Sequence, residues 1–351
     1  MSLQIYDTLR IAELVRPRQG ETRLGEKIQT IPWAYKLNWP DMLDKMSGKY
    51  VLLGLPEDVG VRANFGRGGA YSAWIPALST LLNTQSNQTL DGEEIIVLGH
   101  IDFTAAMNAM KNLDLQKTAD LERSREIVNE IDDAVYPVIS AIVAAGKEPI
   151  LIGGGHNNAY GNLKGTSLAL NKTGTKEIGC INCDAHSDLR PMEGRHSGNG
   201  FSYALHDGYF HRYAMIGLHE MFNSSSVLEK ITGDERLDAS WFEDIFIREK
   251  LTFKEAVDRA INFTKHLPIG LELDLDTIQN IPSSAKTSSG LTTLQARQYV
   301  HWVAEQSDVK YFHLAEAAPV LSHIKTDLKT GKLIAYLICD YIKARNNLKS
   351  V

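Results

Sequence analysis

Ligand-type side chains recur at every second position near the ends of two apolar runs. NCDAHSDLRP places Asp184, His186 and Asp188 at alternate positions, and LELDLDT repeats the spacing with Asp274 and Asp276. Side chains of an extended chain repeat every two residues, so each set can project from one face. A single Asp at a strand end is usually a cap or turn residue. Buried carboxylates this close repel one another, so their recurrence indicates a bound cation.

A third apolar run, PILIGGGHNN, ends in three glycines and then His156. A lone histidine there is more often a turn or core residue, but beside the other two motifs we interpret it as a ligand. The sequence thus offers six candidate metal ligands: His156, Asp184, His186, Asp188, Asp274 and Asp276. Four carboxylates and two imidazoles suit two fairly hard divalent ions, with Mn²⁺ first and Fe²⁺, Ni²⁺, Co²⁺ or Zn²⁺ as alternatives. A water shared by two such ions loses a proton near neutral pH, which predicts hydrolysis.

Strands and helices must bring these side chains together. Short runs that are almost continuously apolar are typical of strands buried on both faces, and they occur at 50–56, 94–100, 148–156, 177–184, 213–218, 269–276 and 310–316. Helical patterns follow at 120–145, 252–266 and 293–306, the second opening with Thr252 and Glu255 at capping-box spacing. This alternation predicts an α/β fold with a mostly parallel sheet, whose ligands gather at the carboxyl ends of the strands.

Composition narrows the class of protein. The 351 residues contain no linker-like tract, so we expect one catalytic domain at 46–351 after an N-terminal extension at 1–45. A net charge of −6 makes nucleic acid a poor partner. The absence of a signal pattern and of an apolar run near 20 residues predicts a soluble, cytoplasmic protein without membrane contact. Three cysteines are too few for a disulfide framework, and we expect buried structural thiols at Cys180, Cys183 and Cys339.

GGGH, DAHSD and ELDLD, in this order and each at a strand end, resemble the metal-binding motifs of the superfamily of arginases, agmatinases and formimidoylglutamases. The resemblance runs from about Val51 to the C-terminus. It implies a three-layer α/β/α sandwich around a mostly parallel eight-stranded sheet, two Mn²⁺ per chain, hydroxide attack on an amidine or guanidine carbon, and a homo-oligomer, either trimer or hexamer. It also implies one ion held by His156, Asp184, Asp188 and Asp274, and another held by Asp184, His186, Asp274 and Asp276. Asp188 would further accept a hydrogen bond from the bridging hydroxide.

The N-terminal part of the domain resembles formimidoylglutamases in particular. EDVGVRANFGRGGA is similar to their opening signature and assigns substrate binding to Arg62, Asn64 and Arg67. GGGH, with Gly155 before the histidine, is the form of that branch, whereas arginases and agmatinases usually carry Asp there.

Beyond the second metal motif, Arg190, Arg195 and Asn199 are candidates to bind a substrate carboxylate, with ordinary surface charges as the alternative. An anionic substrate such as formimidoylglutamate would suit these arginines.

Several positions depart from the family pattern. Glu272 stands for the usual Ser of the third motif, and Gln279-Asn280 stands for Asp-Pro. The Glu that normally meets the cationic amidine aligns with Gln295, which makes arginase and agmatinase activities less expected.

The proton shuttle also departs from the pattern. Phe201 occupies the place of the arginase shuttle histidine, so His196 is either the general acid or a solvated loop residue. Glu316 resembles a late strand-end Glu, for which we expect a structural role.

The leading hypothesis is a binuclear manganese hydrolase that converts N-formimidoyl-L-glutamate and water to L-glutamate and formamide in histidine degradation. The alternatives are another ureohydrolase acting on a guanidino substrate, or a metal-binding homologue without catalysis. A third and weaker interpretation is an α/β scaffold whose motif residues are only caps and turns.

Overall fold

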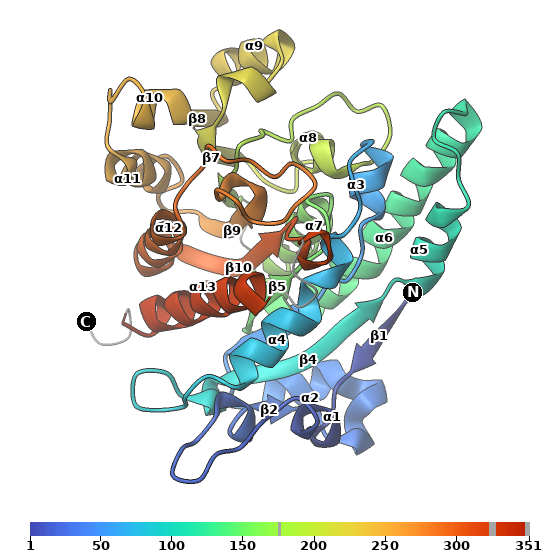
Figure 1. Ribbon diagram of the computed structural model, residues 1–351, viewed down its shortest axis with the longest axis vertical. Coiled ribbons are helices and arrows are strands. Elements are labelled where there is room, and N and C mark those ends of the chain that lie inside the picture. Colours follow the sequence, from blue (N-terminus) through green and yellow to red (C-terminus); the bar gives the residue numbers. More distant parts are fainter. Residues whose placement is uncertain (175–176, 323–327, 348–351) are drawn as a thin grey trace.

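A ten-stranded sheet forms the centre of the computed structural model, which describes residues 1–174, 177–322 and 328–347 (Figure 1). The strands lie in the order β1-β4-β3-β5-β10-β9-β6-β7-β8, and β2 also pairs with β4. Their bounds are β1 Ser2–Ile5, β2 Gln29–Thr30, β3 Tyr50–Gly54, β4 Ile95–Asp102, β5 Glu148–Ile152, β6 Gly179–Cys183, β7 Arg212–Leu218, β8 Leu237–Trp241, β9 Pro268–Asp274 and β10 Asp308–Ala315.

The strands β3 to β10 are mutually parallel and correspond to the eight expected from the resemblance. The expectation of eight for the whole sheet was too low, because β1 and β2 from the first 30 residues also pair with β4. All seven strands predicted from apolar runs are present. The eighth, β8, has the sequence LDASW and lies at the edge of the sheet, where burial on both faces is not required.

Helices cover both faces of the sheet, which confirms the three-layer sandwich. On one face lie α4 (Trp74–Leu82), α11 (Phe253–Phe263), α12 (Thr293–Gln306) and α13 (Leu328–Asn347). On the other lie α6 (Thr118–Ala144), α7 (Asn158–Asn171) and α8 (Gly200–His206). The other α-helices of the described residues are α1 Thr8–Ala12, α2 Trp39–Lys45, α3 Val59–Ala63, α5 Thr104–Lys111, α9 Ser225–Gly233 and α10 Phe242–Phe246. Thr252 and Glu255 form the predicted capping box of α11.

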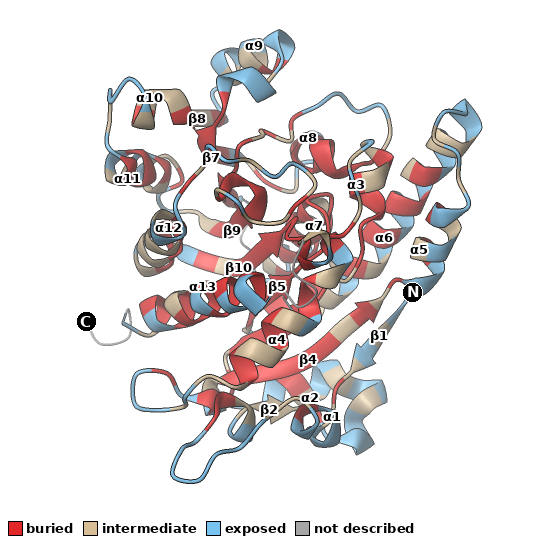
Figure 2. Ribbon diagram, viewed as in Figure 1, coloured by how far each residue is buried: buried red, intermediate tan, exposed pale blue. Residues whose placement is uncertain are grey.

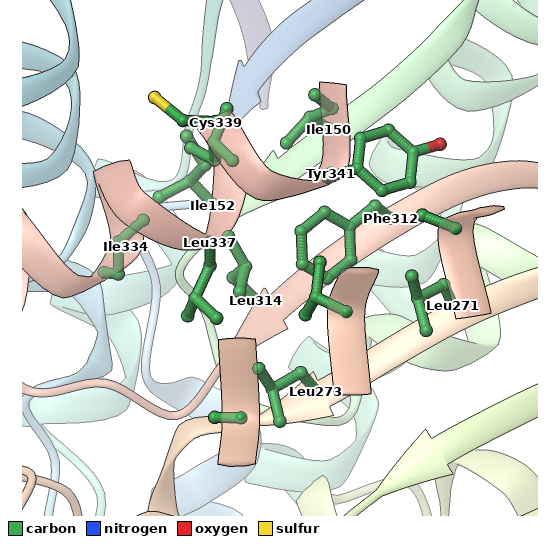
Figure 3. Packing of buried hydrophobic residues seen from close by; sticks show 14 of the residues in the cluster. Ile150, Ile152, Leu271, Leu273, Phe312, Leu314, Ile334, Leu337, Cys339 and Tyr341 are labelled. Carbon is green, nitrogen blue, oxygen red and sulfur yellow. The ribbon is translucent and has the colours of Figure 1, made fainter. Parts of the chain in front are cut away.

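Alternate side chains of each central strand enter different layers of the core. Ile150 and Ile152 of β5 pack with the α13 side, whereas Leu151 packs with the α6 side. Figure 3 shows Phe312 and Leu314 of β10 against helix α13. In Figure 2 the central strands are buried, while exposed residues lie on the outer surfaces of the helices. The core therefore fixes the carboxyl ends of neighbouring strands relative to one another.

The three cysteines are free and buried, as the sequence predicted. Cys180 belongs to the core layer of α6 and Cys183 to the layer of α13, so the two side chains lie on opposite faces of β6. Burial raises the pKa of both thiols well above the ordinary range. Within the described ranges, no helix combines the length and the apolar character that crossing a bilayer requires.

Candidate active site

The six predicted ligands gather at the carboxyl edge of the sheet. His156 follows β5, the DAHSD residues follow β6, and Asp274 ends β9. Ligand atoms of one group lie within 4.8 Å of one another, and the group consists of His156, Asp184, Asp188 and Asp274. A second group meets the same criterion and consists of Asp184, His186 and Asp276. The two groups share Asp184, so the arrangement offers two adjacent ion positions.

The contacts of His156 test whether a cation fits. Its Nδ1 lies 3.1 Å from Asp184 Oδ2, 3.0 Å from Asp188 Oδ2 and 3.2 Å from Asp274 Oδ2. None of these contacts has hydrogen-bond geometry, and both ring nitrogens lack a hydrogen-bond partner among the described residues. One ring nitrogen carries at most one proton and cannot satisfy three carboxylates. A divalent cation among these oxygens would satisfy all of them, so the residues fit the expected metal.

Electrostatic repulsion among these carboxylates also favours a bound cation. Burial, together with the negative charges of Asp276 and Asp184, raises the pKa of Asp274 well above its usual range. Burial also raises the pKa of Asp188, against the opposing effect of His156. Carboxyl groups in such surroundings are costly to ionise without a compensating positive charge.

The backbone around the ligands adopts conformations that few residues accept. Gly153 and Gly154 have φ of 87° and 77°, which end β5 at Ile152 instead of continuing it to His156. A Cβ on Gly155 would lie 2.5 Å from Asn157 Oδ1, so an Asp at this position would require the Asn157 side chain to shift.

Two non-glycine residues at the site also lie in the left-handed region. Asp188 has φ 51° and Glu316 has φ 63°. Such conformations cost about 1–3 kcal/mol each and persist where surrounding structure enforces them.

Glu272 and His313 form a buried layer beneath His156 that sequence reasoning did not identify. Glu272 Oε2 lies 2.6 Å from Nδ1 of His313 and 3.4 Å from Nε2 of His156. Tyr311 donates a hydrogen bond to the other carboxylate oxygen at 2.8 Å. Burial raises the pKa of Glu272, but the two imidazoles outweigh it and bring the pKa to about 2. A charged Glu within an apolar strand was the sequence signal for this buried layer. The sequence analysis interpreted Glu272 only as a departure from the third motif.

A cavity of about 580 Å³ opens over the ligands. Of the predicted substrate residues, Asn64 and Arg190 line it, and Arg190 Nη1 donates to Asn64 Oδ1 at 2.6 Å. Arg62 instead donates to Asp58 Oδ1 at 2.8 Å and lines a different cavity. Arg67 is exposed. The structure thus brings two of these four residues to the ligand cluster.

Three further candidates make contacts within loops and helices. Arg195 is only 2% exposed, so it is not a surface charge, and it pairs with Asp132 through two hydrogen bonds of 2.9 and 3.2 Å. Its Nη1 also donates to the buried Asn199 at 3.0 Å. Gln295 accepts hydrogen bonds from the backbone and hydroxyl of Thr292 and thereby caps α12. All three lie outside the residues described as lining the cavity.

Glu316 lines the cavity, whereas Gln295, which the sequence aligned with the amidine-binding Glu, does not. It follows β10, which lies between β5 and β9, so its carboxylate reaches the cavity beside Asp274 and Asp276. Its Oε1 accepts a hydrogen bond from the backbone N–H of His156 at 3.0 Å. Burial, followed by the charge of Asp274, raises the pKa of Glu316 well above its usual range. Glu316 therefore presents a buried acidic group to any cation in the cavity.

His196 and Phe201 have packing roles in the structure. The rings of Phe201 and His156 form a T-shaped pair, with 5.1 Å between ring centroids. His196 is fully buried, its Nδ1 accepts from the backbone of Gly198 at 3.1 Å, and its Nε2 lies 3.2 Å from Glu193. Burial lowers the pKa of His196 to about 4, although Glu193 acts to raise it. Near neutral pH this imidazole is uncharged and holds the loop.

We expect His196 to make the protein sensitive to acid. Because its folded pKa of about 4 is below the unfolded value, the unfolded chain binds more protons between about pH 4 and 6.5, and stability falls as pH drops through that window. His196→Asn keeps an acceptor for Gly198 but cannot titrate. Urea unfolding of the metal-free protein at about pH 7 and pH 5 should show a loss of stability that is smaller by about 2 kcal/mol in this variant. The exposed His206→Asn is the control, and equal losses in all three proteins would contradict the assignment.

Comparison with known proteins agrees with this geometry. A model of the arginase family matches residues 49–342. A formimidoylglutamase of Streptococcus pyogenes is 24% identical over 310 residues, covering 84% of this chain and 87% of that protein.

Solved structures show the same fold. Formimidoylglutamase from Bacillus subtilis has a TM-score of 0.71 and 18% identity, covering 95% of this chain and 94% of that chain. Formiminoglutamase from Trypanosoma cruzi with Mn²⁺ has a TM-score of 0.68 and 19% identity, covering 92% of this chain and 98% of that chain. The chain therefore belongs to the arginase family and is a hydrolase of carbon–nitrogen bonds in linear amidines that resembles formimidoylglutamase.

Proposed function

We propose that this protein is a binuclear manganese hydrolase whose substrate is N-formimidoyl-L-glutamate, which it converts to L-glutamate and formamide. The observation that carries the proposal is the convergence of two imidazoles and four carboxylates on two adjacent ion positions beneath one cavity. The likeness to formimidoylglutamases supports the choice of substrate.

The ligand cluster would hold both ions. His156, Asp188 and the shared Asp184 surround one position, His186 and Asp276 flank the other, and we assign Asp274 to both. Two bound Mn²⁺ ions would supply a water that is deprotonated near neutral pH.

Side chains that line the cavity would bind the substrate and transfer the proton. Glu316 offers its carboxylate to the cationic amidine, which holds the carbon over the ion positions. Asp188 lines the same cavity and takes over the role considered for His196: it accepts the proton of the attacking water and delivers it to the leaving nitrogen. Arg190 also lines the cavity and offers its guanidinium to the anionic part of the substrate.

A hydrolysis assay tests this function directly. Protein reconstituted with Mn²⁺ is assayed on formimidoylglutamate, arginine, agmatine, guanidinobutyrate and guanidine, and its metal content is measured on the same sample. We expect turnover of formimidoylglutamate with about two metals per chain. Turnover of a guanidino compound alone would replace the proposed substrate, and two bound metals without any turnover would support a homologue that lacks catalysis.

A further inference from the structure

A second cavity, of about 350 Å³, adjoins the one over the metal ligands. The two cavities share four lining residues: Arg190, Pro191, Ser226 and Val227. The second cavity lies between α8 and α9, with Ser202 and Leu205 from the first helix and Lys230 from the second. The outer cavity therefore lies next to the inner one, with Arg190 in the walls of both.

The two cavities differ in charge. The inner lining contains Asp188, Asp274 and Asp276, which we assign to the ions, and Glu316, whose carboxylate is left to meet a cationic group. The described lining of the outer cavity contains no Asp or Glu, and it includes Arg190, Lys230 and Arg236. A basic cavity is notable in a chain whose formal net charge is −6. Such a pair of sites suits a molecule with a cationic head and an anionic tail.

Two basic residues of the outer cavity form no ion pair with a carboxylate among the described residues. Arg236 forms an ion pair with Asp234 at 2.7 Å. Lys230 and Arg190, by contrast, have no carboxylate within 4.0 Å in the part of the chain that the structure describes.

Lys230 is also held in place. It is half-buried, and its Nζ lies 3.5 Å from the hydroxyl of Ser202, which donates to the backbone carbonyl of Arg190 at 2.8 Å. The same serine thus links the ammonium group to the backbone at Arg190. Lys230 and Arg190 both line the outer cavity, so an anion bound there would lie next to both residues.

We propose that Lys230, together with Arg190, forms an anion subsite that binds the carboxylate-bearing end of the substrate. This inference rests on the proposed function and narrows it: the substrate class is a linear amidine joined to an amino acid with an acidic side chain. Lys230 is a specificity-determining residue in this assignment, because the outer cavity lies beyond Arg190 from the metal ligands. A substrate without a carboxylate tail gains nothing from it.

Binding of N-formyl-L-glutamate to the manganese-loaded protein tests the subsite without turnover. This probe has the anionic tail, but an amide replaces the amidine. Calorimetry should show binding to the wild type, about tenfold weaker binding to Lys230→Met, and recovery to within about threefold in Lys230→Arg. Lys172→Met, at an exposed position after α7, is the matched control and should bind like the wild type.

Kinetics separate the subsite from the reaction itself. For formimidoylglutamate, Lys230→Met should raise KM about tenfold with kcat within about twofold, whereas kcat/KM for the tail-less N-methylformamidine should not change. Equal binding of the probe by the wild type and Lys230→Met would overturn the subsite, as would the absence of probe binding to the wild type. A protein that binds the probe through Lys230 but turns over no amidine would retain the subsite and refute the proposed function.

Discussion

Asp274→Asn is expected to abolish turnover and to reduce the stabilisation that bound metal gives. Asp274 ends β9 within the first ligand group, where its Oδ2 lies 3.2 Å from His156 Nδ1, and we assign it to both ion positions. A neutral amide loses the charge that holds the cations, so we expect kcat/KM to fall by about 1,000-fold or more, equal to about 4 kcal/mol of transition-state stabilisation. Bound metal should fall below two ions per chain, as measured by elemental analysis of the assayed sample.

The stability of the metal-free variant provides a sharper test. Burial and the neighbouring carboxylates raise the pKa of Asp274, so its ionised form destabilises the metal-free protein near neutral pH. Metal-free Asp274→Asn should therefore melt at a higher temperature than the metal-free wild type. Added Mn²⁺ should raise the Tm of the wild type more than that of the variant.

Asp308→Asn is the matched control for this experiment, since Asp308 is an exposed aspartate at the amino end of the neighbouring strand β10. It should change neither activity nor metal content. A metal-free Asp274→Asn protein that is less stable than the metal-free wild type would show that Asp274 supports the fold by its charge, and it would count against a cation site.

The central strands were predictable because they are buried on both faces. Continuous apolar runs located β3, β4, β5, β6, β7, β9 and β10. The edge strands escaped this signal: β1 alternates exposed and half-buried residues, and β8 carries Asp238 and Ser240 within five residues. An edge strand needs only partial burial, and its sequence then resembles a loop.

The ligand cluster was predictable for a related reason. A buried carboxylate in an apolar strand is too costly to occur without a cause, so each Asp at a strand end stood out. Arginines carry no such signal. Arg62 pairs with Asp58 at the i,i+4 spacing that favours ion pairs on a helix, but nothing in the sequence indicates that Arg195 pairs with Asp132, 63 residues away. Which carboxylate an arginine meets depends on tertiary packing, and the sequence shows only its charge.

The sequence aligned Gln295 with the amidine-binding residue, whereas we propose Glu316 for that role because its carboxylate lines the cavity. This proposal leads to the second large effect. Glu316→Gln is expected to lower kcat/KM for the amidine about 30- to 4,000-fold, since removing one charge from a buried ion pair costs about 2–5 kcal/mol. The substitution keeps the oxygen that accepts the hydrogen bond from His156, so the fold should be retained. Glu316 lies outside both ligand groups, and the variant should therefore bind as much metal as the wild type. Loss of activity with full metal content distinguishes this role from that of Asp274.

Gln295→Glu is the matched control, because it adds a carboxylate at the position that the sequence alignment had favoured. Gln295 caps α12 through Thr292, and a Glu there can form the same capping box. We therefore expect Gln295→Glu to leave the ranking of formimidoylglutamate, agmatine and arginine unchanged. If that variant instead gained activity toward agmatine or arginine while Glu316→Gln retained full activity, the amidine would be bound from α12. The carboxylate at the end of β10 would then have only the structural role first expected of it.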